Sequence, residues 1–73
     1  MLETIGEKIK YLREKNNYSN KELSQLTGVA RGYLYELEVG RYLNPTVEVV
    51  CKLCRAFDVT PNDLIPTEMY KKK

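Results

Sequence analysis

Two helix signals separated by a glycine constrain the fold of this chain more than any other feature of its sequence. Ser19 and Glu22 have the spacing of a capping box, in which each side chain accepts a hydrogen bond from the other residue's backbone N–H. Gly28 can adopt the positive φ that ends such a helix and reverses the chain. The apolar positions of the two helices are Leu23, Leu26, Val29, Leu34 and Leu37. The stretch therefore predicts two short helices that are joined by a tight turn and bury one face each.

The second of these helices, expected at about residues 30–38, keeps its other face free for a partner. That face carries Arg31, Gly32, Tyr33, Tyr35 and Glu36, a group able to contact the edges of DNA bases. Glu36 repels phosphate, so it is expected either to accept from cytosine N4 or to hold a neighbouring arginine in place. We interpret residues 20–39 as a helix-turn-helix motif whose second helix enters the major groove.

The other segments of the chain also predict helices, and no segment predicts a strand. One amphipathic stripe covers residues 2–15, a second helix is expected from Pro45 or Thr46 to Phe57, and a brief one follows the Thr60-Pro61-Asn62-Asp63 cap. Their expected buried residues are Leu2, Ile5, Ile9, Leu12, Val47, Val50, Leu53, Cys54 and Phe57. The sequence thus predicts an all-α domain over residues 1–66 and a basic tail over residues 67–73.

Composition limits the classes of function that this chain can have. Its 73 residues fit one small domain, and it contains no histidine, no phosphate-binding glycine loop and no catalytic serine motif, so we expect no enzyme and no cofactor. No apolar run approaches a membrane span, and we expect a cytoplasmic protein. The net charge is only +2. DNA binding would therefore depend on placed contacts, including donors to phosphate in the loop that carries Arg41, Tyr42 and Asn44.

Some side chains allow more than one interpretation. Cys51 and Cys54 form a C-x-x-C on a predicted helix, without a second pair or a histidine to complete a zinc site, so we favour packing; a zinc ion or disulfide shared across a dimer is the alternative. The tyrosines at 11, 18, 33, 35 and 42 fit core, interface or DNA contacts, and Tyr33 is favoured for DNA. From composition alone, Arg13 and Glu38 would be two unrelated surface charges.

Taken together, these spacings resemble the Cro/CI-type helix-turn-helix family, also called the XRE family, and within it the SinR-type repressors. The resemblance covers about residues 5–65 and rests on Ile5-Gly6, Ile9, Arg13, Ser19, Glu22-Leu23, Gly28-Val29, Leu34, Leu37-Glu38, Asn44-Pro45, Val59-Thr60-Pro61 and Asp63-Leu64. It implies a five-helix fold and a buried ion pair between Arg13 and Glu38. It also implies base contacts from Arg31, Gly32, Tyr33 and Glu36, and a phosphate contact from Asn20, where the family commonly has glutamine.

The sequence as a whole predicts a transcriptional repressor or autoregulator that binds an inverted-repeat operator as a homodimer. Lys21 and Tyr35 are assigned to the DNA backbone together with Asn20 and the loop residues. The dimer surface is expected on the last helix and its flank, at Leu64, Ile65, Met69 and Tyr70. The rival hypothesis is a protein-interaction module that keeps the fold without binding DNA, which the neutral charge of the motif supports.

Overall fold

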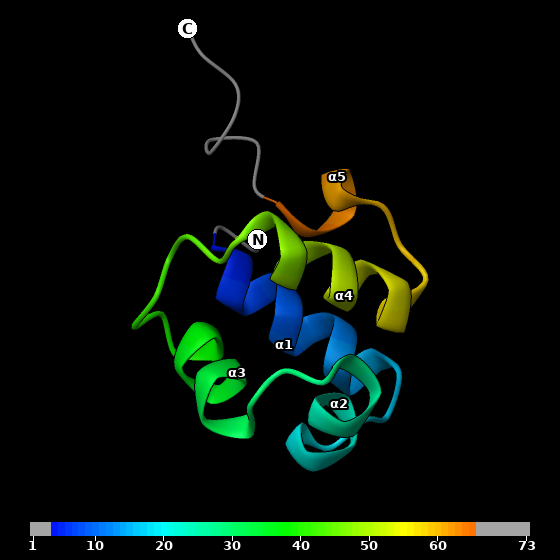
Figure 1. Ribbon diagram of the computed structural model, residues 1–73. Helices are drawn as coiled ribbons and strands as arrows, with labels where there is room; N and C mark the ends of the chain where they lie inside the picture. Colours follow the sequence, from blue (N-terminus) through cyan, green and yellow to red (C-terminus); the bar gives the residue numbers. More distant parts are fainter. Residues whose placement is uncertain (1–3, 66–73) are drawn as a thin grey trace, which may run out of the picture.

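The computed structural model describes residues 4–65, which form five α-helices and contain no strand (Figure 1). The helices are α1 (Ile5–Lys15), α2 (Asn20–Thr27), α3 (Arg31–Glu38), α4 (Val47–Phe57) and α5 (Pro61–Leu64). The expected all-α, five-helix fold is therefore confirmed. The predictions for Leu2, Met69, Tyr70 and the tail at residues 67–73 lie outside the described residues.

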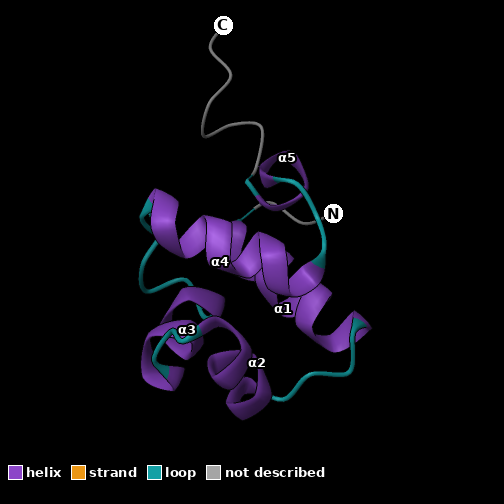
Figure 2. Ribbon diagram, turned by 45° about the vertical axis from the view of Figure 1, so that its right-hand side comes forward, coloured by secondary structure: helices purple, strands orange, loops and turns teal. Residues whose placement is uncertain are grey.

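The helices surround a single core, and their order places α2 and α3 together at one end of the molecule (Figures 1 and 2). Helix α1 contacts α3 and α5, while α2 contacts α3 and α4, and α4 contacts α5. The buried apolar residues are Ile5, Ile9, Leu23, Val29, Leu34, Leu37, Val50, Leu53, Cys54, Phe57 and Leu64. Every helix contributes to this list, so the core fixes the position of α3 relative to the rest of the chain.

Local capping explains where the helices begin and end. Ser19 and Glu22 form the predicted capping box at distances of 2.8 and 3.0 Å, and Gly28 ends α2 with φ of 76°. Thr4 caps α1 in the same way, so this helix begins at Ile5 and not at the first apolar residue of the predicted stripe. Asn17, with φ of 61°, closes α1 in the left-handed conformation, which asparagine adopts more readily than most residues.

Two residues expected in the core are instead exposed. Leu26 is 58% exposed because α2 turns Leu23 and Thr27 toward the core and leaves Leu26 at its flank. Val47 is 79% exposed because it occupies the first position of α4, one turn before the buried part of that helix starts at Val50. Thr46 caps α4, which places Pro45 ahead of the helix and not at its first position.

Leu64, expected on the surface of a dimer, is fully buried in the core. Its helix is only one turn long, and Pro61 and Asp63 fix that turn, with the Asp63 carboxylate accepting from the Thr60 N–H at 3.1 Å. Leu64 consequently closes the core beneath α5 and has no surface to offer to a second chain. The neighbouring Ile65 is half-buried.

The two cysteines lie on α4 as free thiols, Cys54 buried and Cys51 half-buried. Burial raises the pKa of the Cys54 thiol, and the nearby Cys51 and Asp63 raise it further. Over residues 4–65, no three histidine, cysteine, aspartate or glutamate side chains come together as metal ligands would. Within the same residues, no helix has the length and apolar character needed to cross a membrane.

Helices α1 and α3 lie with their backbones close together at Gly6. A Cβ atom at this position would overlap the backbone carbonyl oxygen of Leu37 and would lie 3.0 Å from that of Glu38. Both oxygens belong to the last turn of α3, and backbone atoms cannot rotate away as the end of a side chain can. Glycine at position 6 is therefore required for this helix crossing.

We predict that Gly6→Ala lowers the free energy of unfolding by about 2 kcal/mol or more, because α3 must shift to make room for the methyl group. Gly32→Ala is the matched control, since Gly32 also lies in a helix but a Cβ there meets nothing within 4 Å. The free energy of unfolding of that variant should rise by up to about 1 kcal/mol, because alanine is a better helix former than glycine. Urea unfolding of both variants measures the difference, and equal effects at the two positions would contradict the close approach.

Candidate nucleic-acid interface

The turn that leads into α3 is held by two side chains of α2. The Ser24 hydroxyl donates to the carbonyl oxygen of Val29 at 2.6 Å, and the Thr27 hydroxyl accepts from the N–H of Val29 at 3.1 Å while it donates to Leu23 O. Both backbone groups of Val29 are thereby fixed from α2. Ala30 has no side chain to cap α3, so these hydrogen bonds set the start of the helix in place of a cap.

The end of α3 is tied to α1 by an ion pair between Arg13 and Glu38. Arg13 Nε and Nη2 donate to the two carboxylate oxygens at 2.7 and 3.1 Å, and Nη1 donates to the backbone oxygen of Tyr18 at 3.0 Å. The two side chains are only 16% and 6% exposed. The hydrogen bond to Glu38 raises the pKa of Arg13, against the opposing effect of burial. The pair is thus a two-point clamp that joins helices distant in sequence.

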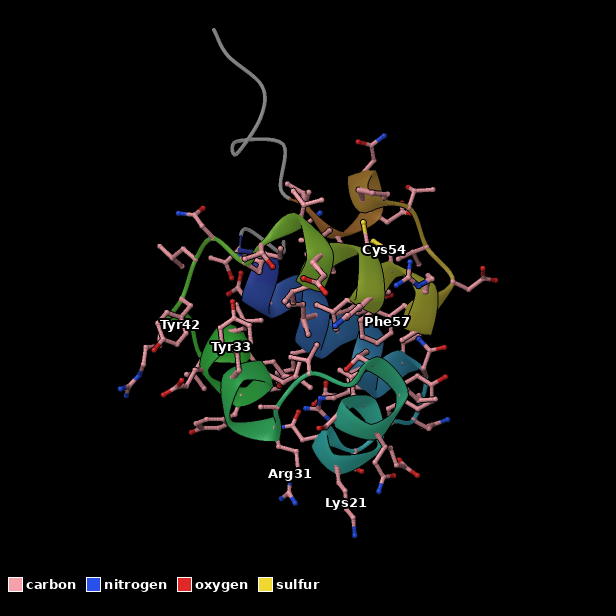
Figure 3. All side chains as sticks on the ribbon, in the orientation of Figure 1. Lys21, Arg31, Tyr33, Tyr42, Cys54 and Phe57 are labelled. Atoms are coloured by element: carbon pink, nitrogen blue, oxygen red, sulfur yellow. The ribbon has the colours of Figure 1, made fainter. Side chains whose placement is uncertain are left out.

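The first turn of α3 projects from the molecule on the same side as the start of α2. Arg31 and Gly32 are exposed, and Lys21 is exposed at the beginning of α2. Figure 3 shows the side chains of Arg31 and Lys21 pointing away from the core in the same direction. Asn20, next to Lys21, is half-buried, and its Oδ1 is buried without a hydrogen-bond partner.

The other predicted contact residues lie along α3 and in the loop that follows it. Tyr33 is half-buried, and its ring packs against the ring of Tyr42 with centroids 5.6 Å apart (Figure 3). Glu36 lies 3.9 Å from Arg41, whose backbone N–H also donates to the carbonyl oxygen of Glu36 at 2.9 Å. This arrangement favours the second of the two roles considered for Glu36, holding a neighbouring arginine.

The last two predicted contact residues lie on the exposed surface. Tyr35 is 56% exposed, and Asn44 is exposed in the loop before α4. The ten predicted DNA-contact residues therefore fall into three sets. Four lie at the starts of α2 and α3, namely Asn20, Lys21, Arg31 and Gly32. Four join α3 to the loop, namely Tyr33, Glu36, Arg41 and Tyr42, and the remaining two are Tyr35 and Asn44.

The residues that orient α3 are harder to recognise in the sequence than the residues of its exposed face. Thr27 was not singled out, although a threonine directly before the helix-ending Gly28 is well placed to bond the turn. Ser24 carries no helix-ending or capping signal of its own, and Gly6 enters only as part of the family pattern. Their roles depend on backbone groups of other helices, which a linear pattern does not reveal.

The sequence that forms α2, the turn held by Ser24 and Thr27, and α3 belongs to a stretch that matches a known family. A model of helix-turn-helix domains matches residues 9–64, most of the chain. The chain belongs to this helix-turn-helix family. The resemblance to Cro/CI-type domains that the sequence suggested is thereby confirmed.

The relatives of this chain include transcriptional regulators. The HTH-type transcriptional regulator SinR of Bacillus subtilis is 34% identical over 61 residues, which are 84% of this chain and 55% of SinR. The chain thus spans about half the length of the curated relatives it matches. The expectation that the chain is not an enzyme agrees with this membership.

Solved structures show the same arrangement of helices. One is the crystal structure of SinR in complex with DNA, in which SinR is described as the master regulator for biofilm formation. It superposes on this chain with a TM-score of 0.81 at 34% sequence identity, and the match covers 84% of this chain and 97% of that one. The restriction–modification controller protein C.AhdI from Aeromonas hydrophila gives a TM-score of 0.78 at 30% identity, covering 84% and 91%. Similarity therefore extends to a protein hardly longer than the matched domain.

We predict that Glu38→Ala lowers the free energy of unfolding by about 3 kcal/mol, because it leaves the guanidinium of Arg13 buried with only the Tyr18 carbonyl as partner. The matched control is Glu36→Ala, whose carboxylate is 35% exposed beside an Arg41 that is 68% exposed; its loss should stay below about 1 kcal/mol. Thermal and urea unfolding of the two variants compare them. Equal stability of Glu38→Ala and wild type would contradict the clamp.

The raised pKa of Arg13 also fixes the pH dependence of this contribution. A basic group whose pKa is higher in the folded state than in the unfolded state adds to the free energy of unfolding. This stabilisation is fully present below the unfolded-state pKa and is lost only as the pH rises through the folded-state pKa. For arginine this range lies far above neutrality. The stability difference between Glu38→Ala and wild type should therefore remain constant from neutral into mildly alkaline solution.

Proposed function

We propose that this chain is a sequence-specific DNA-binding transcriptional regulator. The observation that carries the proposal is the exposed first turn of α3, where Arg31 and Gly32 project beside Lys21 while the opposite face of the helix is buried at Leu34 and Leu37. A helix held in this way can enter the major groove with its first residues against base edges. The similarity to SinR, which was crystallised with DNA, supports the same conclusion.

Base recognition is proposed for the face that carries Arg31, Gly32, Tyr33 and Glu36. Arg31 is the strongest candidate because a guanidinium can donate two hydrogen bonds to guanine O6 and N7. Gly32 has open space around its Cα, so the backbone of α3 can come close to the floor of the groove. Tyr33 and Glu36 lie further along the helix, where both already contact the loop.

Contacts to the DNA backbone are proposed for the residues around this face. Lys21 and Asn20 belong to the start of α2, Tyr35 to α3, and Arg41, Tyr42 and Asn44 to the loop. Phosphate contacts fix the register of a protein on the duplex without reading its sequence. The low net charge of the chain makes such placed donors necessary, because bulk attraction to DNA would be weak.

We further propose that the chain acts in the cytoplasm as a homodimeric repressor or autoregulator on an inverted repeat. A single copy offers few base contacts, and two copies related by a two-fold axis would read half-sites about 34–36 Å apart. Because Leu64 is buried, the surface next to α5 must rely on Ile65 and the flank that contains Met69 and Tyr70. Gel filtration at high micromolar concentration tests the dimer, and a monomer would count against it.

Fluorescence anisotropy tests the proposed function directly. The chain is titrated into the DNA upstream of its own coding sequence and into a scrambled duplex of equal composition, at two salt concentrations. We expect tighter binding to the upstream DNA and a steep loss of affinity with salt, because each phosphate contact releases a counterion. A chain that binds neither duplex, even at low salt, would instead support a module that binds protein.

We predict that Arg31→Ala weakens binding to the operator by about 1–3 kcal/mol and relaxes base preference at one operator position. Lys21→Ala is the matched control, since Lys21 is exposed on the same side; it should weaken binding to all sequences alike and reduce the salt slope by about one. Anisotropy with single-base operator variants separates the two patterns. A uniform loss for Arg31→Ala would assign Arg31 to phosphate.

A further inference from the structure

The loop between α3 and α4 is attached to α3 at two successive turns of the helix. The ring of Tyr33 packs against the ring of Tyr42 with an angle of 39° between their planes, and Glu36 pairs with Arg41 at 3.9 Å. Between these side-chain contacts, the Arg41 N–H donates to the Glu36 carbonyl oxygen. The first residues of the loop therefore pack against α3, the helix that precedes them.

The two pairs differ in strength, and the tyrosine pair is the stronger link. Arg41 is 68% exposed, so solvent screens its attraction to Glu36. Tyr33, by contrast, is half-buried and packs against the hydrophobic core, while Tyr42 is 46% exposed and covers it from outside. Two rings at 5.6 Å attract each other beyond the area they bury. Tyr42 thus rests on a side chain whose own position the core fixes.

We propose that Tyr33 acts on DNA through the loop, as a positioning residue for Tyr42 and the phosphate donors beside it, and not by reading a base. This inference rests on the proposed function and, for Tyr33, replaces the base contact proposed there with a positioning role. In Figure 3 the ring of Tyr33 points toward Tyr42, whereas Arg31 and Lys21 point away from the core at another part of the surface. Base recognition is then concentrated on Arg31 and the exposed backbone at Gly32.

Rigid attachment gives the loop a physical role in affinity. A loop that is free in solution must lose conformational entropy when Arg41 and Asn44 engage phosphate, and this cost reduces the affinity. A loop already held by the tyrosine pair is ordered before it meets DNA. Because phosphate contacts are independent of sequence, loosening the loop should weaken binding to operator and scrambled DNA by the same factor.

A double-mutant cycle tests the proposal with two duplexes, an operator obtained by selecting the wild-type chain's ligands from a random DNA pool and a scrambled duplex. The variants are Tyr33→Ala, Tyr42→Ala, their combination, and the two phenylalanine substitutions. We expect each alanine variant to weaken binding to both duplexes by about fivefold, and the combination to lose hardly more than either one, because the same contact is removed each time. The phenylalanine variants keep both rings, so each should bind both duplexes more tightly than the matching alanine variant, and this difference measures the ring contact apart from any contact made by a hydroxyl group.

Several outcomes would overturn the inference. Losses that multiply in the combined variant would make the tyrosines independent, and a Tyr33→Phe variant with altered base preference would return Tyr33 to base reading. A Tyr42→Phe variant as weak as Tyr42→Ala would make the hydroxyl a direct phosphate donor. Melting temperatures identify any alanine variant that is unstable, and Tyr42→Leu, which keeps apolar bulk without a ring, then replaces Tyr42→Ala in the cycle. If the wild-type chain binds no duplex, the proposed function fails and the inference fails with it. If the wild-type chain binds DNA but the two alanine substitutions reduce the affinity independently, only the inference is overturned.

Discussion

The position of α3 depends on its contact with α1, and the recognition surface depends on α3. The last turn of α3 lies against the backbone of α1 at Gly6, where a side chain would overlap the Leu37 carbonyl. One residue further along α3, Glu38 receives two hydrogen bonds from Arg13. A close steric fit sets the distance between the helices, and a bidentate ion pair sets their rotation. Because both contacts hold the end of α3, the exposed first turn of this helix projects from a fixed base.

The start of α3 is held by a different kind of interaction. Four of the five described helices have a serine or threonine as their N-cap residue, whereas the N-cap residue of α3 is Ala30, whose side chain cannot accept a hydrogen bond. Its orientation comes instead from the hydrogen bonds that Ser24 and Thr27 make to Val29 in the preceding turn. This arrangement leaves the first N–H groups of α3 without a side chain over them, on the surface where the proposed DNA contacts begin. The absence of a cap is thus compatible with a stable helix because the turn is rigid.

Much of this fold could be predicted from local sequence, because its signals act over one helical turn. The capping box at Ser19 and the left-handed residue Gly28 identified α2 and its end. Periodicity failed at Leu26 and Val47, since a pattern cannot show how far the neighbouring helices extend over a face. The pair of Arg13 and Glu38 is separated by 25 residues, so only the resemblance to a family suggested it. For the same reason, the packing of Tyr33 on Tyr42 could not be foreseen from the residues between them.

The distribution of charge in the motif fits a protein that binds DNA by geometry more than by net attraction. Glu36 and Glu38 would both repel phosphate if they stood free, yet Glu38 is 6% exposed against Arg13 and Glu36 lies beside Arg41. Each acid is therefore offset by a neighbouring arginine, and the buried Glu38 also fixes the position of Arg13. Arg31 has no such partner among the described residues, so its charge and its five donors remain available at the tip of the helix. A chain with a net charge of +2 can in this way keep one unpaired guanidinium at the place where specificity is needed.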